Sequence, residues 1–157
     1  MPGRRGVVRV LSHSRKDPRI MIGVLSPDEI DDVLQRHRVG HLACAANDRP
    51  YVVPITYAYD GCCIYAYSGL GRKIDTMREQ PLVCFQVDEQ DGPSEWRSVI
   101  AEGRYEELRD DAARREALAL LGITNGAVSR ALHAGNGAVV FRIRLTERSG
   151  RFERRDA

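Results

Sequence analysis

Two adjacent cations follow closely spaced glycines in the stretch SGLGRKIDTMREQP, which begins at Ser68. Arg72 and Lys73 open a predicted short helix, over about residues 72–79, that Pro81 ends. Cations normally favour the opposite helix end, because the N-terminus already carries partial positive charge. Free backbone N–H groups at that end attract an anion, and the glycines allow a close approach. The stretch predicts a phosphate pocket, with a solvated turn as the alternative reading.

Other side-chain sets that support catalysis are missing from the sequence. There is no G-x-S-x-G elbow, no H-E-x-x-H motif and no complete P-loop. His37 and His41 are four residues apart, but Gly40 and a predicted change from helix to strand separate them. We therefore expect solvent-facing or helix-end histidines and no helical metal pair. The chain offers no evident catalytic acid or base, so a bound cofactor would supply the difficult chemistry.

The four cysteines show no paired C-x-x-C spacing, so neither a zinc site nor a redox dithiol is indicated. The neighbours Cys62 and Cys63 would point to opposite faces of a strand. We expect all four cysteines to be reduced and mostly buried, as small hydrophobic residues.

Length and composition are those of a single soluble globular domain. The chain has 157 residues, of which 43% are hydrophobic and 29% are charged. The net charge of +2 gives no strong argument for nucleic acid or membrane binding. No apolar run approaches the roughly 18 residues of a membrane span, and no secretory signal is recognisable. We expect a cytoplasmic protein.

The predicted domain covers residues 25–150, between an N-terminal arm (1–24) and a C-terminal tail (151–157). Its first helix begins at Ser26, an N-cap that forms a capping box with Glu29. A second helix over residues 110–123 has an acidic start, and residues 125–135 form a possible further helical piece. Gly103 is expected to bend a long strand. The predicted strands cover residues 39–46, 51–60, 62–68, 82–88, 96–108 and 138–150.

The order of these elements indicates a mainly β protein with peripheral helices. Short turns between successive strands require antiparallel neighbours, and there is no alternating βα pattern. Pro54 is awkward in a central strand because it donates no ladder hydrogen bond. It indicates an edge, a bulge, or a place where the backbone faces a ligand. We expect an antiparallel barrel.

Three pieces of the sequence, in this order and spacing, carry a family resemblance. They are the strand VVPITY (52–57), the GRK start of a helix (71–73) that ends before PLVCF, and the strand WRSVIAEGR (96–104). Together they resemble the FMN-binding split-barrel superfamily, which contains the pyridoxamine 5'-phosphate oxidases and the nitroimidazole-resistance-like flavoproteins. The similarity runs from about Leu25 to Leu145 and implies a six-stranded split β-barrel.

The resemblance also assigns a cofactor site. The phosphate of FMN would bind Arg72 and Lys73, the flavin ring would lie along residues 53–56, and the site would sit at a homodimer interface. Trp96 would complete the partner's pocket, or it is a core or interface aromatic residue. The residues assigned to the cofactor on this resemblance are Val53, Pro54, Ile55, Thr56, Tyr67, Ser68, Arg72, Lys73, Trp96 and Ser98.

The implied function is an FMN-dependent oxidoreductase that reduces a small nitroaromatic or quinone acceptor. Vitamin B6 phosphate oxidation is disfavoured, because the C-terminus lacks an arginine-and-histidine substrate motif. Tyr67 stands where nitroimidazole-resistance relatives often have histidine. One alternative is an F420-dependent reductase, with the arginine-rich arm holding the acidic tail of that cofactor. Another is a protein that binds flavin or haem without turnover.

Overall fold

The structure, a computed structural model, describes residues 9–11, 20–123, 126–127 and 137–155. In these ranges the helices are α1 (Pro27–Arg36), α2 (Arg72–Glu79) and α3 (Asp111–Leu120). The strands are β1 (Arg9–Leu11), β2 (Ile20–Val24), β3 (Val39–Ala46), β4 (Arg49–Thr56), β5 (Ala58–Tyr59), β6 (Cys63–Ser68), β7 (Leu82–Gly92), β8 (Glu95–Glu107) and β9 (Val139–Arg155).

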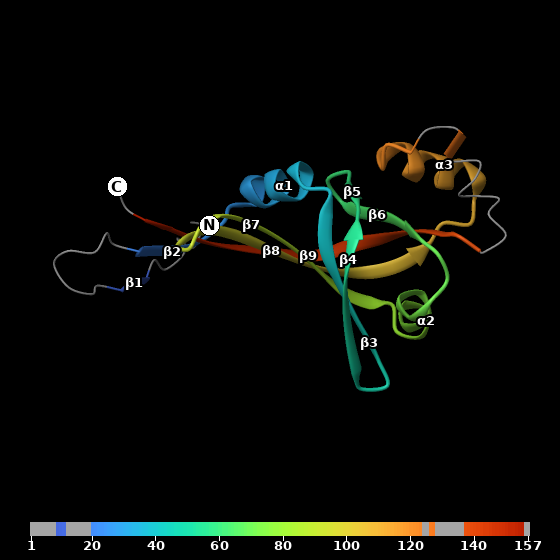
Figure 1. Cartoon of the computed structure of the whole chain (residues 1–157), viewed down its shortest axis with the longest axis horizontal. Helices are drawn as coiled ribbons and strands as arrows, with labels where there is room; N and C mark the ends of the chain where they lie inside the picture. Colours follow the sequence, from blue (N-terminus) through green and yellow to red (C-terminus); the bar gives the residue numbers. More distant parts are fainter. Residues whose placement is uncertain (1–8, 12–19, 124–125, 128–136, 156–157) are drawn as a thin grey trace, which may run out of the picture.

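All described strands belong to one antiparallel sheet in the order β1-β2-β9-β8-β7-β3-β4, and β6 pairs with β9 and with β5. The three helices lie around this sheet (Figure 1). The mainly β class with peripheral helices is thus confirmed. The strand count differs from six because β1 and β2 are added and because residues 51–60 form two strands.

Tyr57 causes the division between β4 and β5. Its backbone N–H donates to Arg38 O (2.9 Å), and its hydroxyl donates to Leu34 O at the end of α1 (2.7 Å). The fully buried ring also packs edge-on against Phe85, with ring centroids 4.8 Å apart. These contacts tie the chain to α1 and interrupt the ladder.

A bulge bends the long strands β8 and β9, as predicted for Gly103. The register shifts between Glu102 and Gly103, so that Thr146 has no partner in β8. A Cβ on Gly103 would lie 2.5 Å from Arg144 O. Only glycine fits this close approach of two backbones, which allows the sheet to curl around its core.

The main core lies inside this curled sheet, and α1 closes one side of it. Ile30, Val33 and Leu34 of α1 are buried in the same hydrophobic cluster as the inward side chains of the strands. The predicted capping box of α1 is present, with Ser26 N–H donating to Glu29 (2.8 Å) and Glu29 N–H donating to the Ser26 hydroxyl (3.3 Å).

Helix α3 covers the outside of β6 and β9. Its Ala117 and Leu118 form a second, smaller cluster with Val140. The helix begins at Asp110, whose carboxylate accepts the N–H of Ala113 (2.9 Å). The further helical piece predicted for residues 125–135 lies almost wholly outside the described residues.

The ends of the domain and one hairpin extend further than the sequence indicated. Within the predicted arm, residues 20–24 form β2, which pairs with the last residues of β9. Strand β9 therefore continues through most of the predicted tail. The expected loop at residues 89–95 is largely strand, because β7 runs to Gly92 and β8 begins at Glu95. This end of the sheet points away from α2 and α3 (Figure 1).

The four cysteines are free thiols, with Cys44 and Cys63 buried and Cys62 exposed. The expectation that Cys62 and Cys63 face opposite ways is wrong. Cys62 precedes β6 and lies in a turn closed by Asp60, so strand alternation does not apply to it, and the two sulfur atoms lie 3.4 Å apart. Among the described helices, none has the length and apolar character needed to cross a bilayer.

Candidate functional site

The start of α2 leaves backbone donors available. Its N-cap residue is Gly71, so no side-chain cap is present, and the first helical bond is Asp75 N–H to Gly71 O (3.1 Å). The N–H groups of Arg72 and Lys73 precede that bond. A Cβ built on Gly69 or Gly71 would meet no heavy atom within 4 Å. The turn is therefore open to a ligand.

Two cations flank this open helix end. The Arg72 guanidinium stacks over the ring of Tyr51 in β4, 4.4 Å from its centroid. Lys73 is half-buried, and burial lowers the pKa of its ammonium group, while the nearby Cys44 thiol acts in the opposite direction. Neither cation forms an ion pair with any carboxylate of the described residues. The start of α2 thus carries two cations that no described carboxylate pairs with.

A hollow adjoins these cations on the side of the β3–β4 hairpin. Asn47 and Asp48 turn the chain there with positive φ angles of 52° and 58°. Asn47 donates to Glu79 at the end of α2 (2.8 Å) and links the hairpin to the helix. The residues lining the hollow are Ala46, Asn47, Arg49, Arg72, Thr76 and Glu79.

Strand β4 has an open edge beside this helix start. It is the last strand of the sheet path and pairs only with β3 among the described strands. Val53 and Ile55 point towards the core, while Pro54 and Thr56 are exposed. Pro54 thus occupies an edge strand, one of the positions predicted for it. The stacking of Arg72 on Tyr51 connects this edge with α2.

Ser98 belongs to a polar row across the outer face of the sheet. The side-chain amide of Gln86 in β7 donates from Nε2 to the Ser98 hydroxyl (3.3 Å), and its Oε1 lies 3.2 Å from His41 Nδ1. His41 in turn lies directly opposite Pro54 in the β3–β4 ladder. Ser98 and Pro54 therefore share one face, four strands wide, although 44 residues separate them in the sequence.

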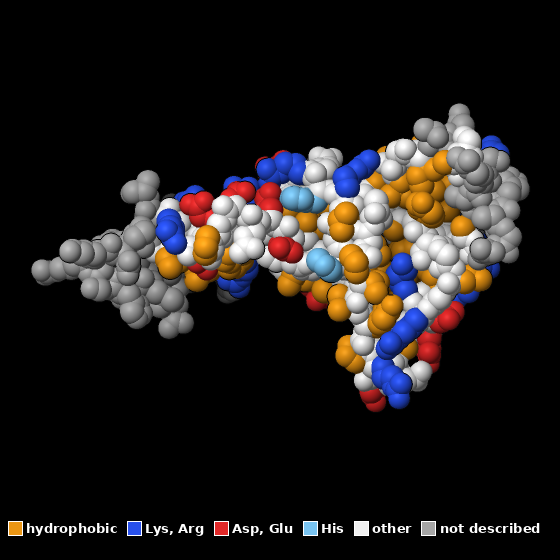
Figure 2. All heavy atoms as spheres, in the orientation of Figure 1, with side chains coloured by type: hydrophobic (Ala, Val, Ile, Leu, Met, Phe, Trp, Pro, Cys, Tyr) orange, Lys and Arg blue, Asp and Glu red, His pale blue; other side chains and the backbone are white. Residues whose placement is uncertain are grey.

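The same outer face exposes large aliphatic side chains. Val39 and Val52 are 57% and 62% exposed, and Leu82 and Ile100 are 61% and 46% exposed. They come from four adjacent strands, β3, β4, β7 and β8. Figure 2 shows hydrophobic side chains uncovered over β3 and β4. Such a patch on a folded chain indicates an interaction surface.

Tyr67 and Ser68 occupy opposite faces of β6. Tyr67 is 46% exposed and lies on the same face as Tyr65, which packs against the α3 cluster. The Ser68 hydroxyl donates to the carbonyl of Gly69 (2.9 Å) in the turn before α2. Within one chain, only Ser68 of this pair therefore contacts the turn that leads into α2.

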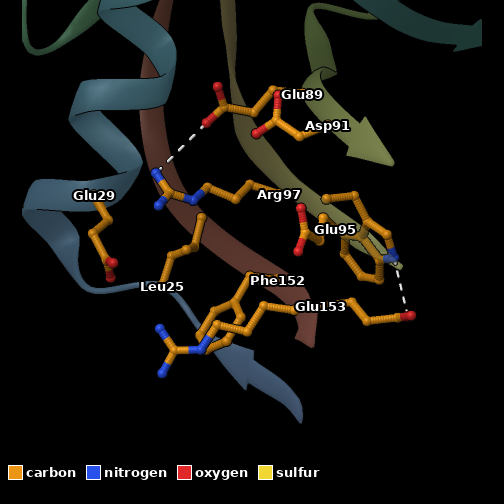
Figure 3. A pocket seen from close by; sticks show the side chains of 10 residues that line it. Leu25, Glu29, Glu89, Asp91, Glu95, Arg97, Phe152 and Glu153 are labelled. Atoms are coloured by element: carbon orange, nitrogen blue, oxygen red, sulfur yellow. Dashed lines mark hydrogen bonds and ion pairs between the residues drawn. The ribbon is translucent and has the colours of Figure 1, made fainter. Parts of the chain in front are cut away.

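Trp96 lies at the far end of the β7–β8 hairpin. Its indole N–H donates to Glu153 of β9 (3.1 Å). It lines a pocket with five carboxylates, where Arg97 points towards Glu89 at 3.7 Å (Figure 3). Within one chain, this acidic pocket and the cations of α2 are at opposite ends of the sheet (Figure 1).

Sequence reasoning missed three residues that shape the site. Tyr51 supports Arg72, and alternation from Val53 and Ile55 would have placed it on the inner face of the strand. His41 and Gln86 join Ser98 to β4, but no local motif marks them, because their contacts depend on the β3–β7 pairing.

These features define a split antiparallel barrel in which an uncapped helix start with two cations lies beside an open strand edge. A family model described as pyridoxamine 5'-phosphate oxidase matches residues 26–152. The match covers most of the chain, which therefore belongs to the pyridoxamine 5'-phosphate oxidase family.

Individual relatives agree with this assignment. The crystal structure of an FAD-binding protein from Mesorhizobium loti is 39% identical, with a TM-score of 0.72, over 86% of this chain and 98% of that one. A structure from Bacteroides thetaiotaomicron, described as a 5-nitroimidazole antibiotic resistance protein, has a TM-score of 0.72 over 98% of both chains. Its identity is 16%, so it supports the fold alone.

A Rhizobium meliloti protein, uncharacterized protein RA0666, is 42% identical over 89 residues. That match spans 57% of this chain and 59% of the relative's length.

Proposed function

We propose that this chain is a flavin-dependent oxidoreductase that holds the phosphate of FMN at the start of α2. The observation that carries the proposal is the pair Arg72 and Lys73 at a helix N-terminus without a side-chain cap. A phosphate there would accept hydrogen bonds from backbone N–H groups and from both cations. The open space around Gly69 and Gly71 fits such a group without displacing protein atoms.

The remaining cofactor contacts follow from the position of β4. The unpaired edge of residues 53–56 offers backbone N–H and C=O groups to the polar side of the ring. Bound flavin would supply hydride or electron transfer to a small acceptor of the nitroaromatic or quinone type. The protein's part is to fix the phosphate and the ring and to shape the space for the acceptor, for which Tyr67 and Trp96 are candidates.

FAD is a second candidate, because the Mesorhizobium relative at 39% identity is described as FAD-binding. The hollow beside Arg72 contains a further cation, Arg49, which a second phosphate could meet. FMN and FAD share the phosphate that the α2 start would hold, so the two candidates differ only beyond it.

The test is a titration of the purified protein with FMN, FAD and riboflavin, followed by the visible spectrum and by flavin fluorescence. We expect a perturbed flavin spectrum, about one FMN per chain, and much weaker binding of riboflavin, which lacks the phosphate. Equal affinities for riboflavin and FMN would contradict the phosphate anchor. If no flavin binds, the flavin proposal fails, and F420 titration is the next measurement.

We also propose that the protein is a homodimer through the outer face of β3, β4, β7 and β8. Burial of Val39, Val52, Leu82 and Ile100 against a second copy would remove exposed apolar surface from water. Within one chain, Trp96 lies too far from α2 to reach the cofactor site (Figure 1). In the dimer, each Trp96 would instead be able to reach the cofactor site of the other protomer.

A charge placed on this face tests the dimer. Val52→Glu should yield monomers in sedimentation velocity, because two carboxylates would be desolvated per interface. Leu120→Glu on α3 is the matched control, since Leu120 is also exposed (40%) but lies on another element. A Val52→Glu protein that sediments like the wild type would refute this interface.

We also propose a cytoplasmic location, which the cysteines support. All four are free thiols, and such cysteines persist where the cell keeps thiols reduced. We therefore expect the enzyme to act in the cytoplasm.

A further inference from the structure

The turn between β5 and β6 brings two thiols together. Gly61 adopts a φ of +102°, a conformation that favours glycine. The Asp60 carboxylate accepts the backbone N–H groups of Cys62 (2.9 Å) and Cys63 (2.8 Å). This closed turn directs both side chains to one side, with the sulfur atoms 3.4 Å apart.

A disulfide does not explain this arrangement. Adjacent residues in a trans peptide have Cα atoms about 3.8 Å apart, whereas disulfides usually require roughly 4.4–6.8 Å. Oxidation within the pair would therefore strain the turn. The two sulfur atoms are better placed to act together as ligands than to bond to each other.

We propose that Asp60, Cys62 and Cys63 bind a thiophilic divalent metal ion of the Zn²⁺ type, with a fourth position open to water. One oxygen of Asp60 and the two sulfur atoms all lie within 4.8 Å of one another. In a tetrahedral zinc site with Zn–S bonds of about 2.3 Å, two sulfur atoms are about 3.8 Å apart. The observed separation of 3.4 Å needs a shift of only a few tenths of an ångström.

The carboxylate retains capacity for a metal. One oxygen of Asp60 accepts the two backbone N–H groups, and the other accepts the hydroxyl of Tyr65 (2.8 Å). A carboxylate offers about four lone-pair positions, so one remains. The Tyr65 hydrogen bond also fixes the orientation of the group, as outer partners do at metal sites.

The surrounding charges suit this ligand set. Two thiolates and a carboxylate around a divalent ion leave one net negative charge. Arg144 lies opposite Cys63 in the β6–β9 ladder, and Arg142 lies opposite Tyr65. Both bond to Glu106 (2.7 Å from Arg142 Nε and 3.0 Å from Arg144 Nε). This group of three carries one net positive charge, which balances the site.

Binding requires no oxidant or reductant. Two metal–sulfur bonds and one metal–oxygen bond form, both thiol S–H bonds break, and two protons pass to the buffer. The metal and the sulfur atoms keep their oxidation states. The site lies at the opposite end of β6 from Ser68, about 17 Å away at the usual rise per residue, so it is separate from the proposed flavin site.

Cd²⁺ titration of the reduced, full-length protein tests the proposal, because cadmium–thiolate complexes absorb in the ultraviolet. With a competing chelator present, we expect one Cd²⁺ per chain. Cys62→Ser should weaken binding by at least the roughly 10- to 100-fold that loss of an outer partner costs at metal sites. Cys84→Ser, at a cysteine on β7, which does not pair with β6, is the matched control and should bind as the wild type does.

Asp60→Asn provides a variant that keeps the turn, since an asparagine oxygen also accepts backbone N–H groups. We expect weaker Cd²⁺ binding with little change in melting temperature. Zn²⁺ should raise the melting temperature of the wild type but not that of Cys62→Ser. The proposal is overturned if the wild type gives no cadmium–thiolate absorption, or if Cys62→Ser binds Cd²⁺ with wild-type affinity.

Discussion

The N-termini of α1 and α2 differ in how their first backbone N–H groups are satisfied. Helix α1 satisfies its own first N–H groups through Ser26 and Glu29, and its first turn is acidic. Helix α2 begins with a glycine that provides no cap and with two cations. The first helix is capped by its own side chains, whereas the first turn of the second holds two cations and one acid, Asp75, and neither cation forms an ion pair with a described carboxylate. An external anion would complete the second helix start.

The variant with the largest expected effect on FMN affinity is Arg72→Ala/Lys73→Ala. It removes two charge-assisted phosphate contacts, which at the usual magnitude costs about 3 to 5 kcal/mol of FMN binding. The affinity should fall roughly a hundredfold to several thousandfold, as measured by fluorescence titration. Riboflavin binding should change little, because riboflavin has no phosphate.

A matched control for that variant is Arg115→Ala/Arg155→Ala, which removes the same net charge at two exposed positions. It should leave FMN affinity within a few-fold of the wild type. An unchanged FMN affinity in the Arg72/Lys73 variant would show that α2 does not hold the phosphate, and the contrast between the helices would lose its functional meaning.

A second variant makes α2 resemble α1. The φ of Gly71 is 161°, which is extended backbone, and a side chain there meets open space. Gly71→Asp should therefore cap α2, stabilise the flavin-free protein by about 0.3 to 1 kcal/mol, and repel a phosphate. We expect a higher melting temperature together with FMN binding that is weaker by about tenfold or more.

The test depends on two opposite changes in the same variant, a gain in stability and a loss of FMN affinity. A Gly71→Asp protein that gains stability and keeps full FMN affinity would mean that the helix start and the cofactor site are separate. Gly92→Asp, also in open space but in the β7–β8 hairpin away from α2, is the matched control and should keep wild-type FMN affinity.

The reverse change, loss of the cap on α1, should affect stability alone. Ser26→Ala removes the hydroxyl that accepts Glu29 N–H (3.3 Å) and should lower the free energy of unfolding by about 1 kcal/mol. Urea denaturation measures this loss. FMN affinity should remain that of the wild type, and a parallel drop in affinity would indicate that α1 also shapes the cofactor site.

Local signals in the sequence were sufficient for much of the fold. The capping box, the helix at residues 72–79, the bend at Gly103 and the edge position of Pro54 each depend on neighbouring residues or on one residue's own chemistry. The break at Tyr57 was not predictable in this way, because it arises from hydrogen bonds to α1, about 20 residues earlier.

The same distinction holds for the site. Arg72 and Lys73 were recognisable because the helix end and the cations are adjacent in sequence. The hydrogen-bonded row of Ser98, Gln86 and His41 forms only because β8, β7 and β3 are adjacent in the sheet. The alternation of apolar residues in the sequence does not predict that strand order. Cys62 and Cys63 were placed on opposite faces because alternation was applied one residue too early, before the Asp60 turn had ended.

The smallest predicted effect concerns the charge of Glu29 in the cap of α1. The hydrogen bond from the Ser26 backbone N–H lowers the pKa of this carboxyl below its ordinary value of 4.5. A lowered folded-state pKa means that ionised Glu29 stabilises the fold above pH 4.5 and that this contribution is lost as the pH falls through the lowered value. Glu29→Gln keeps an acceptor but lacks the charge. Its melting temperature should therefore lie below that of the wild type at pH 7, and this difference should shrink as the pH falls through the lowered pKa of Glu29. A difference that stays constant down to the lowest pH at which both proteins remain folded would show that side-chain shape, and not charge, stabilises the start of α1.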